Sequence, residues 1–231
     1  MQSTNIIELA ELRDQTRVFR DRQHAGQILT QMMQEHKETP AIVMAIPAGG
    51  VPVAAEIAIR LGLPLDVAVV SKITLPWNTE AGYGAVAFDG TVRINHDLAE
   101  RLNLSQQQVE EGILKTRAKV NRRITLFRGE KPLPPLSQRA AILVDDGLAS
   151  GFTMRVAVEA VRKASASLVV VAVSTGHSQS VERIAAEADR IYCPNIRSGW
   201  SFAVADAYEQ WSDVTEQEVL EHLAHLRTQA S

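Results

Sequence analysis

The stretch AILVDDGLASGFTM, from Ala141 to Met154, decides the fold. Its four apolar residues, Ala141 to Val144, predict a fully buried strand of a parallel sheet. Asp145 and Asp146 follow where that strand should end, and the small residues Gly147 to Gly151 predict a loop that can bring backbone N–H groups against an anion. Apolar residues then recur at helical spacing, so the loop opens onto a helix N-terminus, where unpaired N–H groups and the macrodipole favour phosphate.

The chemistry of this stretch suits a sugar phosphate. Two carboxylates can hold sugar hydroxyls or a magnesium ion, and the loop can hold a phosphate of the same ligand, so ribose 5-phosphate would satisfy both parts. The alternative is an ordinary strand–loop–helix connection with exposed aspartates. The stretch is not a Walker A loop, because it lacks the Gly-Lys-Ser/Thr ending, and no G-x-G-x-x-G follows a strand as in dinucleotide-binding folds.

The composition is that of an ordinary globular protein. The 231 residues are 45% hydrophobic and 22% charged, and a chain of this length can bury a sizeable core. The net charge of −3 predicts neither a nucleic acid nor a membrane surface as partner. The one cysteine, Cys193, excludes an internal disulfide framework and a cysteine-cluster metal site. Without a long apolar segment or a signal peptide, we expect a cytoplasmic protein.

Strands that alternate with helices predict a three-layer α/β fold with a mostly parallel sheet. The predicted core strands, in chain order, are 41–46, 65–70, 141–145, 168–173 and 190–193. The first and third strands carry the two glycine-containing loops and should be neighbours. We therefore expect a five-stranded sheet of order 2-1-3-4-5, with a ligand cleft at the switch point. Between the second and third strands, the sequence predicts an Asp-Gly hairpin over 83–94 and a long helix that Ser105 and Gln108 cap.

The first strand runs into the second candidate anion loop, Pro47-Ala48-Gly49-Gly50. Pro52 falls in the first turn of the helix that follows, and Gly62 ends it. We expect the backbone N–H groups of Gly49 and Gly50 to face an anion. Strand 65–70 ends at Ser71-Lys72, where Lys72 can add a positive charge.

The sequence VDDGLASGFT resembles the phosphoribosyl-pyrophosphate (PRPP) motif of the type I phosphoribosyltransferases, and the resemblance covers roughly residues 19–215. It implies transfer of ribose 5-phosphate from PRPP to a nucleobase-like acceptor, with release of pyrophosphate. It also implies Mg²⁺ that binds with PRPP rather than in a dedicated protein cage.

The resemblance also implies a role for each residue that matches the family's motifs. Asp145 and Asp146 would hold the ribose or its magnesium; Gly147, Leu148, Ala149, Ser150, Gly151 and Thr153 the 5-phosphate; and Ala48, Gly49, Gly50 and Lys72 the pyrophosphate. The family usually has arginines at the positions of Ala48 and Ser71, so two cations are missing from the pyrophosphate subsite. Ala149 stands where enzymes for 6-oxopurines carry an Asp base, which disfavours hypoxanthine and guanine as acceptors.

The remaining candidate residues lie on loops near the predicted cleft. Residues 73–82, with Trp77 and Asn78, correspond to the family's mobile catalytic flap, and His177 follows strand 168–173 at its C-terminal end. A tryptophan that packs on its own domain and an ordinary loop histidine are the alternatives. The aromatic residues of 194–212 would line a hood over the acceptor or form a small core.

We expect a single phosphoribosyltransferase-like domain over 1–231. Its core would span about 19–72 and 139–193, with a hairpin and long-helix insertion at 73–131 and a hood and terminal helix at 194–231. The apolar stripe of the terminal helix would pack on the domain or on the second subunit of a homodimer. Arg20 and Arg22 are expected to be solvated rather than to bind a ligand. The basic side of helix 105–127 is also expected to be solvated, with a nucleic-acid or substrate surface as the alternative; its residues are Lys115, Arg117, Lys119, Arg122 and Arg123.

Two other functions stay open from the sequence. A PRPP- or nucleotide-sensing regulator of the same fold, with little turnover, would explain why Ala48 and Ser71 replace arginines. No helix-turn-helix is evident, which argues against a version that binds DNA. A phosphate-ester hydrolase could use Asp145 and Asp146, but no metal-binding histidine lies near them in the sequence.

Overall fold

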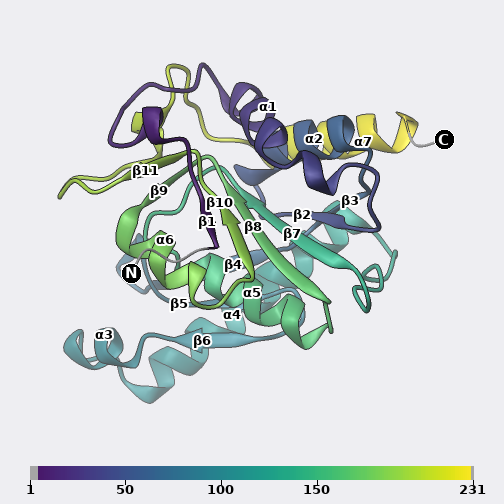
Figure 1. Ribbon diagram of the computed structural model, residues 1–231. Coiled ribbons are helices and arrows are strands. Elements are labelled where there is room, and N and C mark those ends of the chain that lie inside the picture. The colour runs from purple at the N-terminus through teal and green to yellow at the C-terminus, as the bar shows by residue number, and fades with distance from the viewer. Residues whose placement is uncertain (1–4, 230–231) are drawn as a thin grey trace.

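The computed structural model describes residues 5–229, and Figure 1 shows them as a central sheet with helices on both faces. In the described part of the chain this sheet has six strands, all parallel, in the order β1-β10-β8-β7-β2-β3. The strands are β1 (Ile6–Ile7), β2 (Ile42–Ala45), β3 (Leu65–Val67), β7 (Ala140–Asp145), β8 (Leu168–Val173) and β10 (Arg190–Tyr192).

The predicted α/β class and the predicted order of five core strands are confirmed. The sheet has one strand more than predicted, because β1 pairs with β10 at its edge, with Ile6 opposite Ile191. A strand of two residues is too short to show periodicity in the sequence, so only the pairing partner identifies it.

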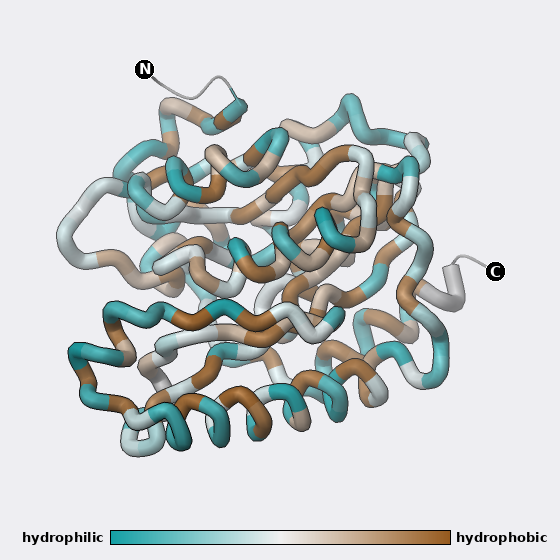
Figure 2. Tube along the Cα trace, turned by 90° about the horizontal axis from the view of Figure 1, so that it is seen from below, coloured by the Kyte–Doolittle hydropathy of each residue, from teal (hydrophilic) through white to brown (hydrophobic). Residues whose placement is uncertain are grey.

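Continuous apolar runs form the central strands because both faces of the sheet are covered. In β2, Val43 and Ala45 belong to the core on one face, whereas Ile42 and Met44 belong to the core on the other. The first face is covered by α1 (Arg22–Met32), α2 (Gly50–Leu61), α4 (Gln106–Arg128) and α7 (Glu216–Gln229), and the second by α5 (Phe152–Lys163) and α6 (Ser178–Ala185). Figure 2 shows the apolar residues along the interior and the polar ones on the outer turns of the helices.

The local signals for helix ends act where the sequence places them. The carboxylate of Asp21 accepts a hydrogen bond of 2.7 Å from the backbone N–H of His24 at the start of α1. Ser105 and Gln108 form the predicted capping box of α4. Gly62 follows α2 with φ +66°, in the left-handed region that favours glycine.

The segment after β3 forms a second, antiparallel sheet, β4-β5-β6. Its strands are β4 (Val70–Leu75), β5 (Asn78–Ala87) and β6 (Val92–Ile94). The predicted hairpin over 83–94 is confirmed, with Gly90 at φ +86° in its turn. The prediction that strand 65–70 is continuous was wrong, since β3 ends at Val67 and β4 begins at Val70, after two intervening residues.

The prediction of a loop over 73–82 was also wrong. These residues are the end of the β4–β5 hairpin, whose turn contains Pro76 and Trp77 and whose pairing shifts register on both sides of Thr74. The polar residues and glycines of β5 are poor strand formers, which hid the strand from the sequence. Pairing on both sides stabilises it, and a Cβ atom on Gly84 would lie 2.8 Å from the carbonyl oxygen of Arg93 on β6.

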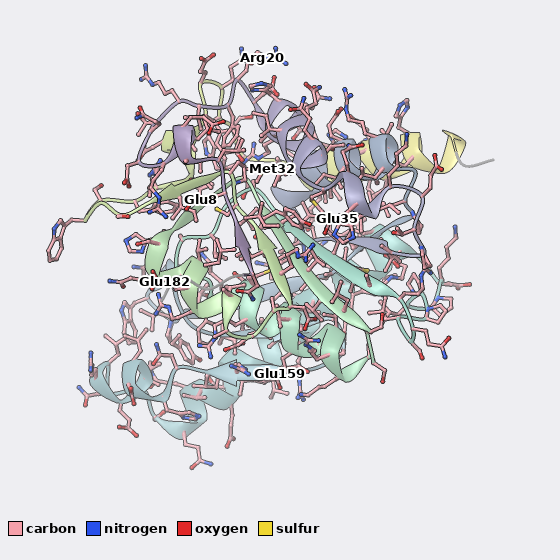
Figure 3. The ribbon with its side chains drawn as sticks, viewed as in Figure 1. Glu8, Arg20, Met32, Glu35, Glu159 and Glu182 are labelled. Atoms are coloured by element: carbon pink, nitrogen blue, oxygen red, sulfur yellow. The ribbon has the colours of Figure 1, made fainter. Side chains whose placement is uncertain are left out.

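The other elements are short. They are α3 (His96–Arg101), β9 (Thr175–His177), β11 (Asn195–Arg197) and 3-10 helices at Ala10–Leu12, Gln34–His36 and Val204–Ala207. Strands β9 and β11 pair in parallel as a separate two-stranded sheet. An ion pair between Arg93 on β6 and Glu159 on α5 ties the antiparallel sheet to the second face. Figure 3 labels Glu159. None of the helices in residues 5–229 combines the length and the apolar character needed to cross a membrane.

The close packing of α1 on α2 predicts that Gly26→Ala destabilises the protein. A Cβ atom at Gly26 would lie 2.7 Å from the Cβ atom of Glu56 and 2.8 Å from the carbonyl oxygen of Val53. Overpacking of this kind lowers the free energy of unfolding by about 1–3 kcal/mol, which outweighs the gain of up to about 1 kcal/mol in helix propensity. Urea unfolding should show the loss, while Gln31→Ala on the exposed side of α1 should change it by less than about 0.5 kcal/mol. A Gly26→Ala protein as stable as wild type would contradict the tight contact.

Candidate active site

A cleft lies where β2 and β7 end, and it consists of two adjoining cavities. The phosphate-loop cavity, of about 180 Å³, is lined by Lys72, Asp145, Gly147, Leu148, Ala149, Ser150, Gly151, Thr153, Met154 and Val204. The helix-side cavity, of about 270 Å³, is lined by Ile46, Pro47, Val70, Ser71, Lys72, Thr74, Lys119, Arg123, Asp145 and Thr153. Both cavities include Lys72, Asp145 and Thr153 in their walls, so one ligand can occupy the two together.

The phosphate loop, residues 147–151, is fixed at its middle and at its end. Leu148 donates its N–H to the carbonyl oxygen of Thr175 at 2.8 Å and accepts from the N–H of His177 at 3.0 Å, which anchors the loop to β9. Gly151 precedes α5 with φ +73°, a conformation that L side chains rarely adopt. A Cβ atom on Gly147 would lie 2.4 Å from Val204, so the loop can approach that residue only with glycine here.

The loop presents backbone donors to its cavity. Among the described residues, the N–H groups of Ala149, Ser150 and Gly151 have no hydrogen-bond acceptor from the protein. They stand at the N-terminus of α5, where the helix dipole adds positive potential. The side chain of Ser180 donates to the carbonyl oxygen of Ala149 at 2.5 Å, which helps to hold the loop in place. The geometry therefore suits a phosphate group.

The two carboxylates of the acidic pair point to different surroundings. Asp145 lines both cavities, whereas Asp146 lines neither. The Oδ2 atom of Asp146 lies 2.9 Å from Nε of Arg22, and its carboxylate covers Gly49 so closely that a Cβ atom there would be 2.0 Å from Oδ2. The hydroxyl of Tyr208 donates to the backbone oxygen of Asp146 at 2.7 Å. Contact of both carboxylates with one sugar stays a prediction, and Asp145 is the one that faces the cleft.

Arg22 was expected to be solvated, and that expectation was wrong. Its exposed fraction is 9%, and besides Asp146 it donates to the carbonyl oxygen of Ser212 at 2.8 Å. Its guanidinium carbon lies 3.9 Å from the centre of the Trp211 ring. Arg20, by contrast, extends to the outer edge of the molecule (Figure 3). The partners of Arg22 are more than 120 positions away in the sequence, so no local pattern indicates them.

Burial changes the protonation of the pair. Burial of Asp145 away from water raises the pKa of its carboxyl well above the ordinary value, and the negative charge of Asp146 raises that pKa further. Burial also raises the pKa of Asp146, although the guanidinium of Arg22 opposes that shift. Solvent still reaches Asp145 through the cleft, so a cation that bound there would lower its pKa again.

In the turn after β2, one of the two backbone N–H groups that were expected to face an anion is bonded within the turn itself. The Gly50 N–H donates to the carbonyl oxygen of Ile46 at 3.1 Å, so the expectation that it faces a ligand was wrong. A Cβ atom on Gly50 would lie 2.5 Å from the carbonyl oxygen of Val144, and this glycine therefore lets the turn pack on β7. The Pro47–Ala48 peptide bond in this turn is cis. Neither Ala48 nor Gly49 lines the two cavities.

The other predicted residues lie at different distances from the cleft. Lys72 is in both cavity walls, and Ser71 is in one. Trp77 and Asn78 lie at the end of the β4–β5 hairpin, with Trp77 61% exposed, and the ring of His177 packs edge-on against Phe202. These three residues line neither cavity, so their link to an acceptor or a flap stays a prediction.

Two basic residues of the site, Lys119 and Arg123 on α4, were expected on the solvated side of that helix, with a substrate surface as the alternative. Both line the helix-side cavity, and the expectation that the basic side of this helix is solvated was wrong for Arg123, whose exposed fraction is 8%. Their spacing of four residues places them on one side of the helix. The four-residue spacing was visible in the sequence, but the sequence did not show that these two side chains face the cleft.

The donor set of the cleft suits a hard divalent cation only in part. No group of three or more His, Cys, Asp or Glu side chains in the described part of the chain could hold a metal ion. Asp145 offers one carboxylate to the cleft, and Mg²⁺ prefers oxygen ligands, often shared with the phosphates of a substrate.

Comparison with known proteins decides the family. The chain matches the family model of the phosphoribosyl transferase domain over residues 15–207. The chain belongs to this family. It is 34% identical over 207 residues to a Mycobacterium tuberculosis protein named "Putative phosphoribosyl transferase". The match covers 90% of this chain and 46% of that protein, so the chain spans about half the length of the curated relatives it matches.

A solved structure of similar size supports the fold. The crystal structure of TT1426 from Thermus thermophilus has 32% sequence identity and a TM-score of 0.73, and the match covers 90% of this chain and 98% of that one. The family that the sequence motif predicts is thus confirmed. In this phosphoribosyl transferase domain, the cleft at the ends of β2 and β7 is the candidate active site.

The buried ion pair between Arg22 and Asp146 predicts a strong coupling between these two residues. Arg22→Met leaves the Asp146 carboxylate buried without a partner, which should lower the free energy of unfolding by about 3–5 kcal/mol. Asp146→Asn in the same protein should recover part of that loss, giving a coupling of up to about 3 kcal/mol in a double-mutant cycle of urea unfolding. Arg20→Met, which removes an exposed pair with Asp21, is the control and should cost about 1 kcal/mol or less. Additive effects of the two substitutions would show that the pair is not coupled.

The raised pKa of Asp145 predicts a stability that falls as the pH rises. The unfolded carboxyl loses its proton near the ordinary value of 3.8. Between that pH and the higher folded pKa, only the folded state holds the proton, so the free energy of unfolding decreases with pH and stays lower above the folded pKa. Asp145→Asn does not titrate and should therefore raise the Tm at pH 8, by about 2–4 °C for each kcal/mol, but much less at pH 4.

Thermal unfolding of both proteins from pH 4 to pH 8 measures this difference. Glu130→Gln removes an exposed carboxylate and is the control, with little change expected at either pH. A difference in Tm between Asp145→Asn and wild type that is the same at pH 4 and pH 8 would contradict the raised pKa.

Proposed function

We propose that this protein is a phosphoribosyltransferase, which transfers ribose 5-phosphate from PRPP to a nucleobase-like acceptor and releases pyrophosphate. One observation carries the proposal: the phosphate loop, Asp145 and Lys72 surround a single cleft at the ends of β2 and β7. An anion cradle, a carboxylate and a cation in that arrangement match the phosphate, the sugar and the leaving group of PRPP. Membership of the phosphoribosyl transferase domain family supports it.

Each part of the cleft would act on one part of the substrate. The free N–H groups of the phosphate loop and the dipole of α5 would hold the 5-phosphate. Asp145 would accept hydrogen bonds from the ribose hydroxyls, with the carboxylate form favoured once a cation lies near it. Lys72 would stabilise the negative charge that develops on the leaving pyrophosphate.

Magnesium would arrive at this site together with PRPP rather than in a cage made by the protein. Asp145 is the residue that would hold it together with oxygens of the ligand, and the ion would neutralise charge on the pyrophosphate as it leaves.

The acceptor would bind beside the hood, residues 194–212. Val204, in the 3-10 helix of this segment, forms part of the phosphate-loop cavity wall. The hood also holds the Phe202 ring 4.5 Å from the guanidinium carbon of Arg197 and against His177, which gives that side an aromatic surface for a planar base. Trp77 and Asn78 stay candidates for a flap or for acceptor contacts.

The regulatory alternative finds no support in the comparisons with known proteins. That alternative was raised because Ala48 and Ser71 stand where the family usually has arginines. Other basic residues in the wall of the cleft, Lys72, Lys119 and Arg123, can supply positive charge. A cytoplasmic location and a homodimer stay predictions from the sequence.

Release of pyrophosphate tests the proposal. Wild-type protein with PRPP and Mg²⁺ should release pyrophosphate only in the presence of the right base, so a panel of purine and pyrimidine bases identifies the acceptor. Asp145→Asn removes contacts to a charged group, which should lower PRPP affinity or turnover by about 10- to 100-fold, whereas Glu130→Gln should match wild type. Failure of the wild-type protein to bind PRPP in calorimetry would overturn the proposal.

A further inference from the structure

The helix-side cavity carries an excess of positive charge. Lys72, Lys119 and Arg123 are in its wall, against the single carboxylate of Asp145. We propose that Lys119 and Arg123, both on α4, bind the pyrophosphate group of PRPP and supply the two positive charges that Ala48 and Ser71 lack. This inference rests on the proposed function and assigns residues to one part of its substrate.

The packing of α4 explains why both side chains reach the cavity. The helix lies along β4 and β5 (Figure 1), and Gly112 lets it approach them closely. A Cβ atom on Gly112 would lie 2.2 Å from the hydroxyl oxygen of Tyr83 and 2.9 Å from the side chain of Ile73. Residues seven and eleven positions further along share that side of the helix, which brings Lys119 and Arg123 over the start of β4.

The guanidinium of Arg123 is held in place but incompletely bonded. One terminal nitrogen lies 3.5 Å from the carbonyl oxygen of Pro47, in the turn after β2, and the group stacks 5.3 Å from the centre of the Phe127 ring. Its Nε lies 3.3 Å from a carboxylate oxygen of Glu216, in a geometry that makes no hydrogen bond. Burial lowers the pKa of Arg123, and a bound anion would oppose that effect.

A second buried polar group faces the same cavity without a partner. The side chain of Ser71 is 4% exposed, and its hydroxyl oxygen has no hydrogen-bond partner among the described residues. Buried polar groups are nearly always hydrogen-bonded. Two incompletely bonded groups, Ser71 and Arg123, next to the ammonium groups of Lys72 and Lys119, therefore indicate a ligand with several acceptor oxygens.

The position of this cavity identifies the anion as pyrophosphate rather than the 5-phosphate. The helix-side cavity adjoins the phosphate-loop cavity through Lys72, Asp145 and Thr153. In PRPP the pyrophosphate on C1 and the phosphate on C5 lie on opposite sides of the ribose. A ribose beside Asp145, with its 5-phosphate in the loop, would direct its pyrophosphate toward α4.

Calorimetric titration with three probes tests the assignment. PRPP with Mg²⁺ and pyrophosphate with Mg²⁺ both use the helix-side cavity, whereas ribose 5-phosphate does not. Lys119→Gln and Arg123→Gln should each weaken PRPP and pyrophosphate by about 10- to 100-fold, because each removes a hydrogen bond to a charged group. Ribose 5-phosphate should bind all variants with the wild-type affinity.

The control is Arg117→Gln, which removes one positive charge from an exposed position of the same helix that lies outside both cavities. It should bind all three probes as wild type does. Thermal unfolding accompanies each titration, and if Arg123→Gln fails to fold, Lys119→Gln decides, since Lys119 is exposed and its substitution leaves the core intact.

The outcomes separate this assignment from the proposed function. Unchanged PRPP affinity in Lys119→Gln, or an equal loss for ribose 5-phosphate, would overturn the role of α4 while the transferase proposal stands. A wild-type protein that binds pyrophosphate but neither PRPP nor ribose 5-phosphate would overturn the transferase proposal. In that case, weaker pyrophosphate binding by Lys119→Gln would still support the anion site. Binding of none of the three probes by wild type would overturn both.

Discussion

The site depends on a close contact between two turns at the ends of neighbouring strands. The turn after β2 lies against the end of β7 so tightly that Gly49 touches the carboxylate of Asp146 and Gly50 touches the carbonyl oxygen of Val144. A side chain at Gly50 would press on the backbone of β7 at the point where the cleft forms, and one at Gly49 would displace the carboxylate of Asp146. The parallel pairing of Ala45 with Val144 brings the two turns to the same level, so the register of the sheet positions both halves of the cleft.

Asp145 and Asp146 have different roles because of this contact. Asp146 is turned away from the cavities toward Arg22, which in turn contacts Ser212 and the ring of Trp211. Arg22 thus links α1 to the end of β7 through the ion pair with Asp146. It also links α1 to the segment before α7 through its contacts with Ser212 and Trp211. Asp145 is left facing the cleft, in an environment that raises its pKa. Asp145 is the last residue of β7 and Asp146 follows in the bend after it, so the strand end separates a carboxylate that stabilises the fold from one that can meet a ligand.

The antiparallel sheet and α4 form the other wall of the cleft. Their attachment to the core is specific: Nε of Arg128, the last residue of α4, lies 3.1 Å from the carboxylate of Asp66, and Arg128 also donates to the carbonyl oxygen of Val67 at 2.8 Å. Both partners are on the edge strand β3, which fixes the end of α4 beside the main sheet. An insertion held in this way can place side chains in the cleft as firmly as the core strands do.

The sequence by itself determined the features that depend on neighbours along the chain. Apolar runs indicated the central strands, Ser105 with Gln108 and Gly62 marked helix ends, and the pattern from Val144 to Thr153 indicated the family and the phosphate loop. Only the tertiary structure decided which groups meet across the chain. In the tertiary structure Asp146 pairs with Arg22, and the Gly50 N–H is bonded within its own turn. Residues with weak strand preference form β5, and Lys119 and Arg123 lie in the wall of the cavity. The physical reason is that hydrogen bonding, capping and periodicity act over a few residues, whereas burial and ion pairing join residues that are distant in sequence, and the sequence carries no local sign of those partners.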